Sequence, residues 1–111
     1  MSCTKDKENP TISITSPENH SNHMIGGAVS VSATFSDDLE LSYYHVHIGN
    51  ENGNHTMEFM YEDYGSLTGK TYEFTNSISV PDTIGSVYYL HFQVLDTQGK
   101  ETKEKIMLHF M

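Results

Sequence analysis

The chain has 111 residues, which is enough for one domain with a modest core and too few for two. Its 15 acidic and 6 basic residues give a formal net charge of −9, which argues against a nucleic-acid or anionic-lipid surface because both need clustered Lys and Arg. No stretch approaches the roughly 20 apolar residues of a membrane-spanning helix, and the seven histidines of this acidic chain favour a cation as partner.

The first nine residues are polar and charged, and they contain the single cysteine, Cys3. A lone cysteine cannot form an internal disulfide, and no apolar neighbours place this one in a core. Two interpretations stay open: an accidental exposed thiol, or the lipid-bearing cysteine of a bacterial lipoprotein with residues 1–9 as its tether. On the second, the protein is an outer-membrane lipoprotein of the cell envelope, surface-exposed or periplasmic, and meets the membrane only through its lipid anchor.

From residue 10 onward, apolar and polar residues alternate with a period of two between turns rich in Gly, Asn, Asp and Pro. This is the pattern of half-buried β-strands. It predicts an all-β fold, an immunoglobulin-like antiparallel β-sandwich of about seven strands over residues 10–111. In chain order the expected strands are 10–17, 28–36, 41–49, 55–62, 70–80, 86–96 and 102–111, and the register of 55–62 is unclear.

Several segments carry a resemblance to bacterial Ig-like domains. The opening strand PTISITSP (10–17), the turn SDDLEL (36–41) and the turn DTQGK (96–100) resemble the corresponding parts of that family. The segment HVHIGNENGNH (45–55) is similar to a group of uncharacterised His-rich Ig-like lipoproteins of Bacteroidetes. It departs from them in the Ile48 that follows the histidine and in having one loop histidine where that group tends to have two. The resemblance implies the fold, which hosts adhesion, spacer and binding roles alike.

Histidines recur on the polar faces of the predicted strands. Because Val46, Leu90 and Leu108 mark the inward faces, the outward face of one sheet should carry four histidines. Neighbours across strands lie about 5 Å apart, so these rings could converge on one ion. We therefore expect His45, His47, His91 and His109 to be metal ligands. The possible accessory ligands, expected near the same end of the sandwich, are His20, His23, His55, Met107 and Met111.

The ion and the rival function follow from the residue types. Imidazole suits Zn²⁺ and Cu²⁺ while thioether sulfur favours Cu⁺, so copper or zinc is the expected cofactor, with nickel behind. The alternatives are solvated histidines without a ligand, or a metal-free adhesion or accessory module that binds an envelope protein or a glycan. The sequence shows no Ser-His-Asp or Cys-His arrangement and no phosphate-binding loop, so we do not expect an enzyme.

Acidic residues fall in two turns that should lie at the opposite end of the sandwich. Asp37, Asp38 and Asp96 could form a calcium site from hard oxygen ligands. The more ordinary interpretation is that Asp37 and Asp96 cap their turns by accepting hydrogen bonds from backbone amides. Calcium is therefore the less favoured ion.

Overall fold

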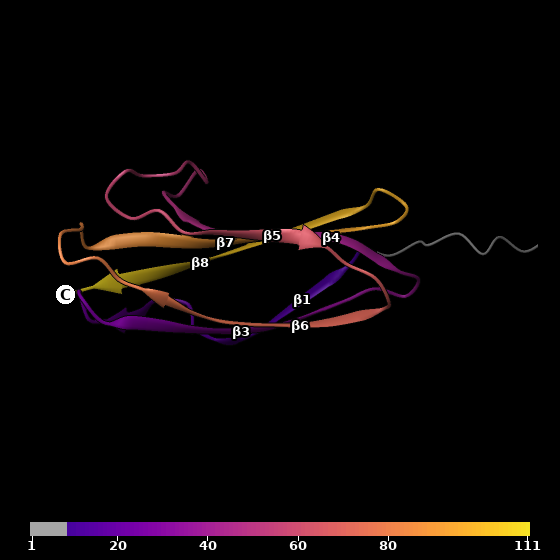
Figure 1. Cartoon of the computed structure of the whole chain (residues 1–111), viewed down its shortest axis with the longest axis horizontal. Coiled ribbons are helices and arrows are strands. Elements are labelled where there is room, and N and C mark those ends of the chain that lie inside the picture. The colour runs from indigo at the N-terminus through magenta and orange to yellow at the C-terminus, as the bar shows by residue number, and fades with distance from the viewer. Residues whose placement is uncertain (1–8) are drawn as a thin grey trace, which may run out of the picture.

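The computed structural model describes residues 9–111, which form two packed β-sheets (Figure 1). The expected tether, apart from Asn9, and the candidate lipidation site Cys3 lie outside the described residues. Within the described part of the chain no helix could cross a membrane. The strands are β1 (Thr11–Ser16), β2 (Ser21–His23), β3 (Ala28–Ser36), β4 (Leu41–Gly49), β5 (Glu62–Ser66), β6 (Thr71–Ser79), β7 (Val87–Asp96) and β8 (Glu101–Phe110).

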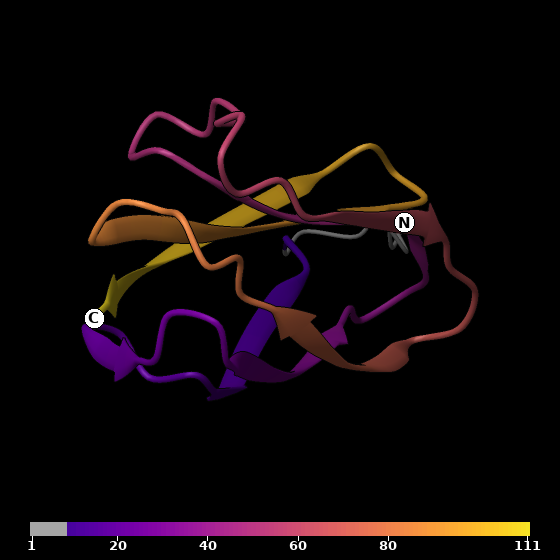
Figure 2. The same cartoon turned by 60° about the vertical axis from the view of Figure 1, so that its left-hand side comes forward.

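The predicted all-β, Ig-like sandwich is confirmed. One sheet has the order β1-β3-β6 and the other the order β2-β8-β7-β4-β5. Neighbouring strands are antiparallel except for β2 and β8, which are parallel. The loop between β4 and β5 rises above the five-stranded sheet (Figure 1), and the end of β8 lies beside β2 (Figure 2).

Two elements differ from the sequence prediction, which gave about seven strands where residues 9–111 form eight. The expected strand 55–62 is wrong: β5 starts at Glu62, and the residues before it form a loop. Phe59 in that loop is buried and packs edge-on against Tyr88 and Phe110, so its hydrophobicity marks a core anchor and not a strand. The short β2 lacks apolar alternation and was not expected. The other predicted strands lie within one residue of their expected bounds.

Aromatic residues make up seven of the twenty buried core residues within residues 9–111, in a chain with five Phe, seven Tyr and no Trp. Phe35 of β3 is fully buried, and its ring packs against those of Tyr44, Tyr72, Phe74 and Phe92. The expected inward residues of β4, β7 and β8 are all buried, which confirms their register: Val46, Ile48, Leu90, Phe92, Leu108 and Phe110. The alternate residues of these strands, including the histidines, therefore face outward.

Asp96, at the end of β7, caps the turn to β8. One carboxylate oxygen accepts hydrogen bonds from the amides of Gln98 (2.9 Å) and Lys100 (2.8 Å), and Asp37 accepts one from the amide of Leu39 (3.0 Å). The turn-capping interpretation is thus confirmed for both aspartates. Among residues 9–111 no three acidic or imidazole side chains are arranged to hold an ion, so the possible calcium site of Asp37, Asp38 and Asp96 is not assembled.

Replacing Asp96 with Ala is expected to lower the free energy of unfolding by about 2 kcal/mol, because two backbone amides lose their acceptor in a site where the side chain is only 2% exposed. Urea denaturation measures this change. The matched control is Asp38→Ala, at the exposed residue that follows Asp37. Its free energy of unfolding should stay within about 0.5 kcal/mol of that of the parent chain. Equal losses in the two variants would contradict the capping role.

Candidate metal centre

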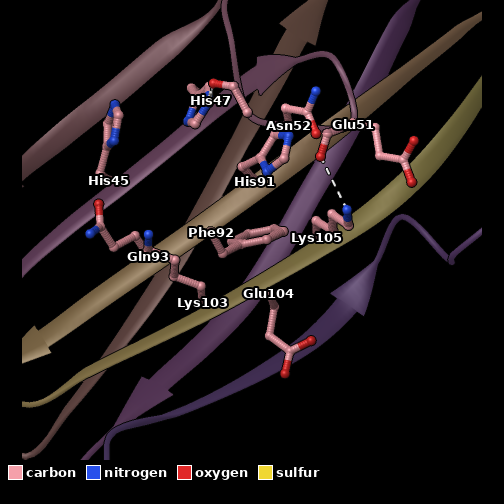
Figure 3. A pocket seen from close by; sticks show the side chains of 11 residues that line it. His45, His47, Glu51, Asn52, His91, Phe92, Gln93, Lys103, Glu104 and Lys105 are labelled. Atoms are coloured by element: carbon pink, nitrogen blue, oxygen red, sulfur yellow. Dashed lines mark hydrogen bonds between the residues drawn. The ribbon is translucent and has the colours of Figure 1, made fainter.

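Strands β4 and β7 bring three histidines together on the outward face of the five-stranded sheet. His47 lies directly opposite His91 in the antiparallel pair, and His45 lies two residues away on β4. The ring centroid of His47 is 4.8 Å from that of His91 and 4.9 Å from that of His45, with interplanar angles of 13° and 17°. The three imidazoles therefore form a nearly parallel stack across two strands (Figure 3).

The segment after β4 adds a fourth ring and a carboxylate. The ring centroid of His55 lies 4.9 Å from that of His47. Glu62 sits opposite His47 in the β4–β5 pair, with its Oε2 atom 2.6 Å from Nε2 of His45 and 3.8 Å from Nε2 of His55. We call His45, His47, His55 and His91 the four-histidine cluster. The sequence did not identify Glu62 as a site residue because the register of its segment could not be read.

The Asn- and Gly-rich residues 49–54 form a closed turn beside the cluster. Asn50 Oδ1 accepts hydrogen bonds from the amides of Asn52 (2.9 Å) and Asn54 (3.0 Å). Gly49 permits the chain to fold back, since a Cβ there would lie 2.6 Å from the carbonyl oxygen of Asn54. Gly53 has a φ of +89°, a conformation that favours glycine. A composition typical of a flexible loop therefore builds a defined turn.

Backbone carbonyls of this turn hold two of the rings. Nε2 of His47 donates to the carbonyl of Gly53 (2.8 Å), and Nε2 of His91 donates to the carbonyl of Asn50 (2.7 Å). His45 uses the same nitrogen to donate to the carboxylate of Glu62. Because these oxygens only accept, Nε2 carries a hydrogen in each ring, and Nδ1 is the nitrogen that holds the lone pair whenever the ring is neutral. Metal-ligating histidines commonly have their second nitrogen held in this way.

The Nδ1 atom of His47 is buried, and within residues 9–111 it has no hydrogen-bond partner. Leaving such an atom unsatisfied costs about 1–3 kcal/mol. Burial lowers the pKa of His47, against the opposing effect of its bond to Gly53, and the neighbouring imidazoles lower it further. Burial, with a contribution from Lys105, also lowers the pKa of His91. Both rings are therefore neutral at pH 7, the protonation state that binds a metal ion.

The orientation of the rings sets a condition on metal binding. Since the stacked planes are inclined by only 13° and 17°, the three Nδ1 lone pairs do not converge on one point. In the described chain no three His, Cys, Asp or Glu side chains are arranged to hold an ion. At least one ring must turn about χ2, a soft torsion in histidine, before coordination is possible. The donor types, imidazole nitrogen with a nearby carboxylate, fit Zn²⁺ and Cu²⁺.

A pocket of about 430 Å³ opens beside the stack (Figure 3). It is bounded by His45, His47 and His91, by the turn at 51–53, and by the outer part of β8. Lys105 ties the turn to β8, because its Nζ donates to the carbonyl of Glu51 (3.1 Å), the interaction dashed in Figure 3. The pocket gives an ion access to the rings and leaves space for a water or small ligand.

His109 does not belong to the four-histidine cluster, which corrects the sequence prediction. His91 pairs with Lys105 on β8, whereas His109 pairs with Val87. Four residues of strand therefore separate His109 from the row of His91, a distance of about 13 Å. Its ring stacks instead on that of His20, at 5.9 Å. The alternation of apolar and polar residues predicted correctly that His109 faces outward, but it did not predict where His109 lies along the strand relative to His91.

Of the accessory candidates, only His55 joins the cluster. His23 lies on β2 with its ring 5.8 Å from that of Phe110, and its Nε2 is hydrogen-bonded to the hydroxyl of Ser21 (2.7 Å). Burial lowers the pKa of His23. Met107 and Met111 lie farther along β8 than Lys105, beside His109, and are therefore also outside the cluster.

Metal-free protein is expected to lose stability as the pH falls from about 7.5 to 5.5. The pKa of His47 and of His91 is lowered in the folded state, so the unfolded chain binds more protons once the pH passes through about 6.5. Melting temperatures in buffers with a chelator measure the decline. In a His47→Gln variant the melting temperature should fall less steeply with pH, because the Gln amide can still donate to Gly53 but does not titrate. Identical pH profiles would contradict the lowered pKa of His47.

The chain is similar in structure to several solved proteins of low sequence identity, one of which, with a TM-score of 0.60, supports the fold. The sporulation control protein Spo0M from Bacillus subtilis is 7% identical, with a TM-score of 0.60 over 93% of this chain and 49% of that one, so this chain spans about half its length. CopC from Methylosinus trichosporium OB3b is 11% identical, with a TM-score of 0.47 over 90% of this chain and 93% of that one. The apo-form Calx CBD1 domain is also 11% identical, with a TM-score of 0.49 over 94% of this chain and 99% of that one. No curated protein matches the sequence. A family model described as "Domain of unknown function (DUF4625)" matches residues 1–111.

Proposed function

The chain belongs to the DUF4625 family, and from its geometry we propose that it binds a transition metal, copper or zinc, through the four-histidine cluster. One observation carries the proposal: the ring of His47, whose buried Nδ1 has no hydrogen-bond partner among the described residues, has its centroid 4.8, 4.9 and 4.9 Å from the centroids of three further imidazoles. A metal ion would satisfy Nδ1 of His47 and would also use ring nitrogens of the neighbouring imidazoles, in their deprotonated form.

The ligand set follows from which ring nitrogens are engaged. His45, His47 and His91 have Nε2 bound to an oxygen acceptor, so each would coordinate through Nδ1. Neither ring nitrogen of His55 makes a hydrogen bond with another described residue, and its Nε2 only approaches Oε2 of Glu62 to 3.8 Å. His55 would therefore complete the ligand set. Glu62 would position His45 and His55. This set differs from the sequence prediction in replacing His109 with His55.

The test is a titration of metal-stripped, Cys3→Ser protein with Zn²⁺ in a calorimeter, paired with two-bond ¹H–¹⁵N correlation spectra of the imidazole rings. The substitution removes the one thiol, which would compete for the metal. We expect binding of one equivalent, with Nδ1 signals of His45, His47 and His91 shifting together. Cu²⁺ is then compared with Zn²⁺ by competition to rank the two ions.

The same spectra carry the internal control. The signals of His20, His23 and His109 should not follow the first equivalent of Zn²⁺, because these rings lie outside the cluster. Weak, unsaturable shifts, or shifts confined to those three rings, would refute the site. Before metal is added, the spectra should also show the hydrogen on Nε2 of His47 and His91, as their carbonyl partners require.

A metal-free interaction module is the second candidate, and exposed side chains near the cluster favour it. Met57 is 94% exposed and Met60 66%, both in the loop between β4 and β5, and Tyr64 on β5 is 61% exposed. Apolar side chains gathered on one segment can form a docking surface for a protein or glycan. A partner captured equally well with and without a chelator would support this candidate, whereas loss of capture in a chelator would make the metal part of the interface.

We propose further that the protein is a lipoprotein of the bacterial cell envelope, anchored through Cys3, as in the Bacteroidetes lipoproteins that the sequence resembles. This rests on the single cysteine in a charged leading segment. Expression in a Bacteroidetes host with a clickable fatty acid tests it. Label on the parent protein made from its natural precursor, and none on its Cys3→Ser variant, is the expected result; equal labelling or none on both would reject it.

A further inference from the structure

A second group of metal-binding side chain types lies on the β2–β8 pair. Met111 donates its amide hydrogen to the carbonyl of His23 (3.1 Å), and its carbonyl accepts from the amide of Ile25 (3.0 Å). In a parallel ladder, a residue bonded to both i−1 and i+1 of its neighbour lies opposite residue i. Met111 therefore lies opposite Met24, on a strand about 4.8 Å away.

The two methionines face outward. Phe110 and His23 are paired and turn toward the core, so the next residue on each segment turns toward the opposite face. Met24 is 73% exposed and Met111 75%, so core packing does not explain either side chain. Both line a second pocket, of about 250 Å³, together with Asn22 and His23 at this end of the sheet. Two thioether sulfurs thus project from neighbouring positions beside one hollow.

Two imidazoles, those of His109 and His20, lie next along the same face, outside the residues that line the second pocket. His109 precedes Met111 by two residues on β8 and shares its face, at a spacing of about 7 Å. The ring of His20 stacks on that of His109, with centroids 5.9 Å apart and planes inclined by 26°. Within the described chain, neither ring makes a hydrogen bond through its nitrogens, in contrast to the rings of His45, His47 and His91. These rings are therefore free to turn toward an ion.

We propose that this face is a second metal site, selective for a soft monovalent ion such as Cu⁺, with ligands from Met24, Met111, His109 and His20. Thioether sulfur is a soft donor that prefers Cu⁺ to Zn²⁺, whereas an all-imidazole set suits the divalent ions. His109, the proposed ligand nearest to the four-histidine cluster along β8, lies about 13 Å from the row of His91, and Met111, just past the end of β8, lies about 20 Å from it. One ion cannot bridge the two sites, and they divide the ions by softness.

The test uses Ag⁺, a soft monovalent ion that does not change oxidation state, on full-length chain carrying Cys3→Ser. That background removes the thiol, which would otherwise take the soft ion first. The methyl signals of the methionines and the ring signals of the histidines are followed by NMR during the titration. We expect the methyl groups of Met24 and Met111 to shift together and to saturate at one equivalent, accompanied by the ring of His109.

A pair of double variants separates this site from general thioether binding. Met24→Leu with Met111→Leu removes two exposed thioethers at nearly constant volume and should weaken Ag⁺ binding by about 10–100-fold. The matched control, Met57→Leu with Met60→Leu, removes two exposed thioethers from the β4–β5 segment and should leave the affinity unchanged. Equal losses in both double variants, or methionine signals that all shift alike, would overturn the proposal.

The result stands apart from the function proposed above. Zn²⁺ titration of the Met24→Leu, Met111→Leu variant should still move the rings of His45, His47 and His91, since neither thioether lies near them. If Ag⁺ bound only at the four-histidine cluster, the second site would be rejected while the first remained. If Zn²⁺ bound at neither and Ag⁺ still saturated Met24 and Met111, the second site alone would stand.

Discussion

Replacing His47 with Ala is expected to weaken Zn²⁺ and Cu²⁺ binding by more than about 100-fold, since losing even an orienting residue of a metal site commonly costs 10–100-fold. His47 is the residue whose ring lies next to each of the other three in the cluster. Competition against a chelator of known affinity, in the Cys3→Ser background, measures the change. The effect should be much larger than that of Glu62→Gln, which leaves all four imidazoles in place.

The matched control is His109→Ala, an outward-facing histidine on the same sheet that lies about 13 Å along β8 from the row of His91. Its divalent affinity should equal that of the parent chain. The pair therefore distinguishes the four-histidine cluster from the face-wide site that the sequence predicted. A loss in the His109 variant as large as in the His47 variant would favour the predicted site and count against the cluster.

Replacing Phe35 with Ala is expected to lower the free energy of unfolding by about 3–5 kcal/mol. Phe35 is fully buried between the two sheets, with aromatic neighbours from β4, β6 and β7 around it. The free energy of unfolding of a small domain is only about 5–15 kcal/mol in total, so the variant should be partly unfolded at 37 °C. Urea denaturation followed by circular dichroism gives the difference from the parent chain.

Two further variants keep this expectation testable if Phe35→Ala does not fold. Phe35→Leu retains much of the side-chain volume and should give a smaller, measurable loss. Ser30→Ala, at an exposed position of the same strand, should change the stability by less than about 0.5 kcal/mol. A loss below about 1 kcal/mol in Phe35→Leu and Phe35→Ala alike would show that the aromatic core is not where the stability resides.

The comparison of sequence and structure shows where pattern reading succeeds. Strands β3 and β7 alternate strictly and β4 alternates from Tyr43 to Ile48, and a slip of one residue would bury their polar side chains. Their bounds and inward faces were therefore predictable. Residues 55–61 have no such pattern, because Phe59 enters the core from a loop, and the strand expected there does not exist.

The candidate site was predicted in part. That His45 and His47 share one face follows from their spacing, and that β4 pairs with β7 follows from the fold type. The position of His109 was predicted wrongly because alternation repeats every two residues and does not determine which residue of β8 pairs with which residue of β7. Glu62 and the carbonyls of Asn50 and Gly53 were not identified at all, since a carboxylate without a register and a backbone oxygen leave no signal in the sequence.

The sequence by itself determined the β-sandwich, the inward and outward faces of its main strands, and the acidic, histidine-rich character of the chain. These properties depend on local periodicity and composition, which each strand carries within itself. The tertiary structure decided which histidines meet, which nitrogens stay free, and that the methionines near the end of β8 lie with His109 and not with His47. Those facts depend on the relative register of strands and on the path of the turn at 49–54, both of which are set by packing between segments far apart in the chain.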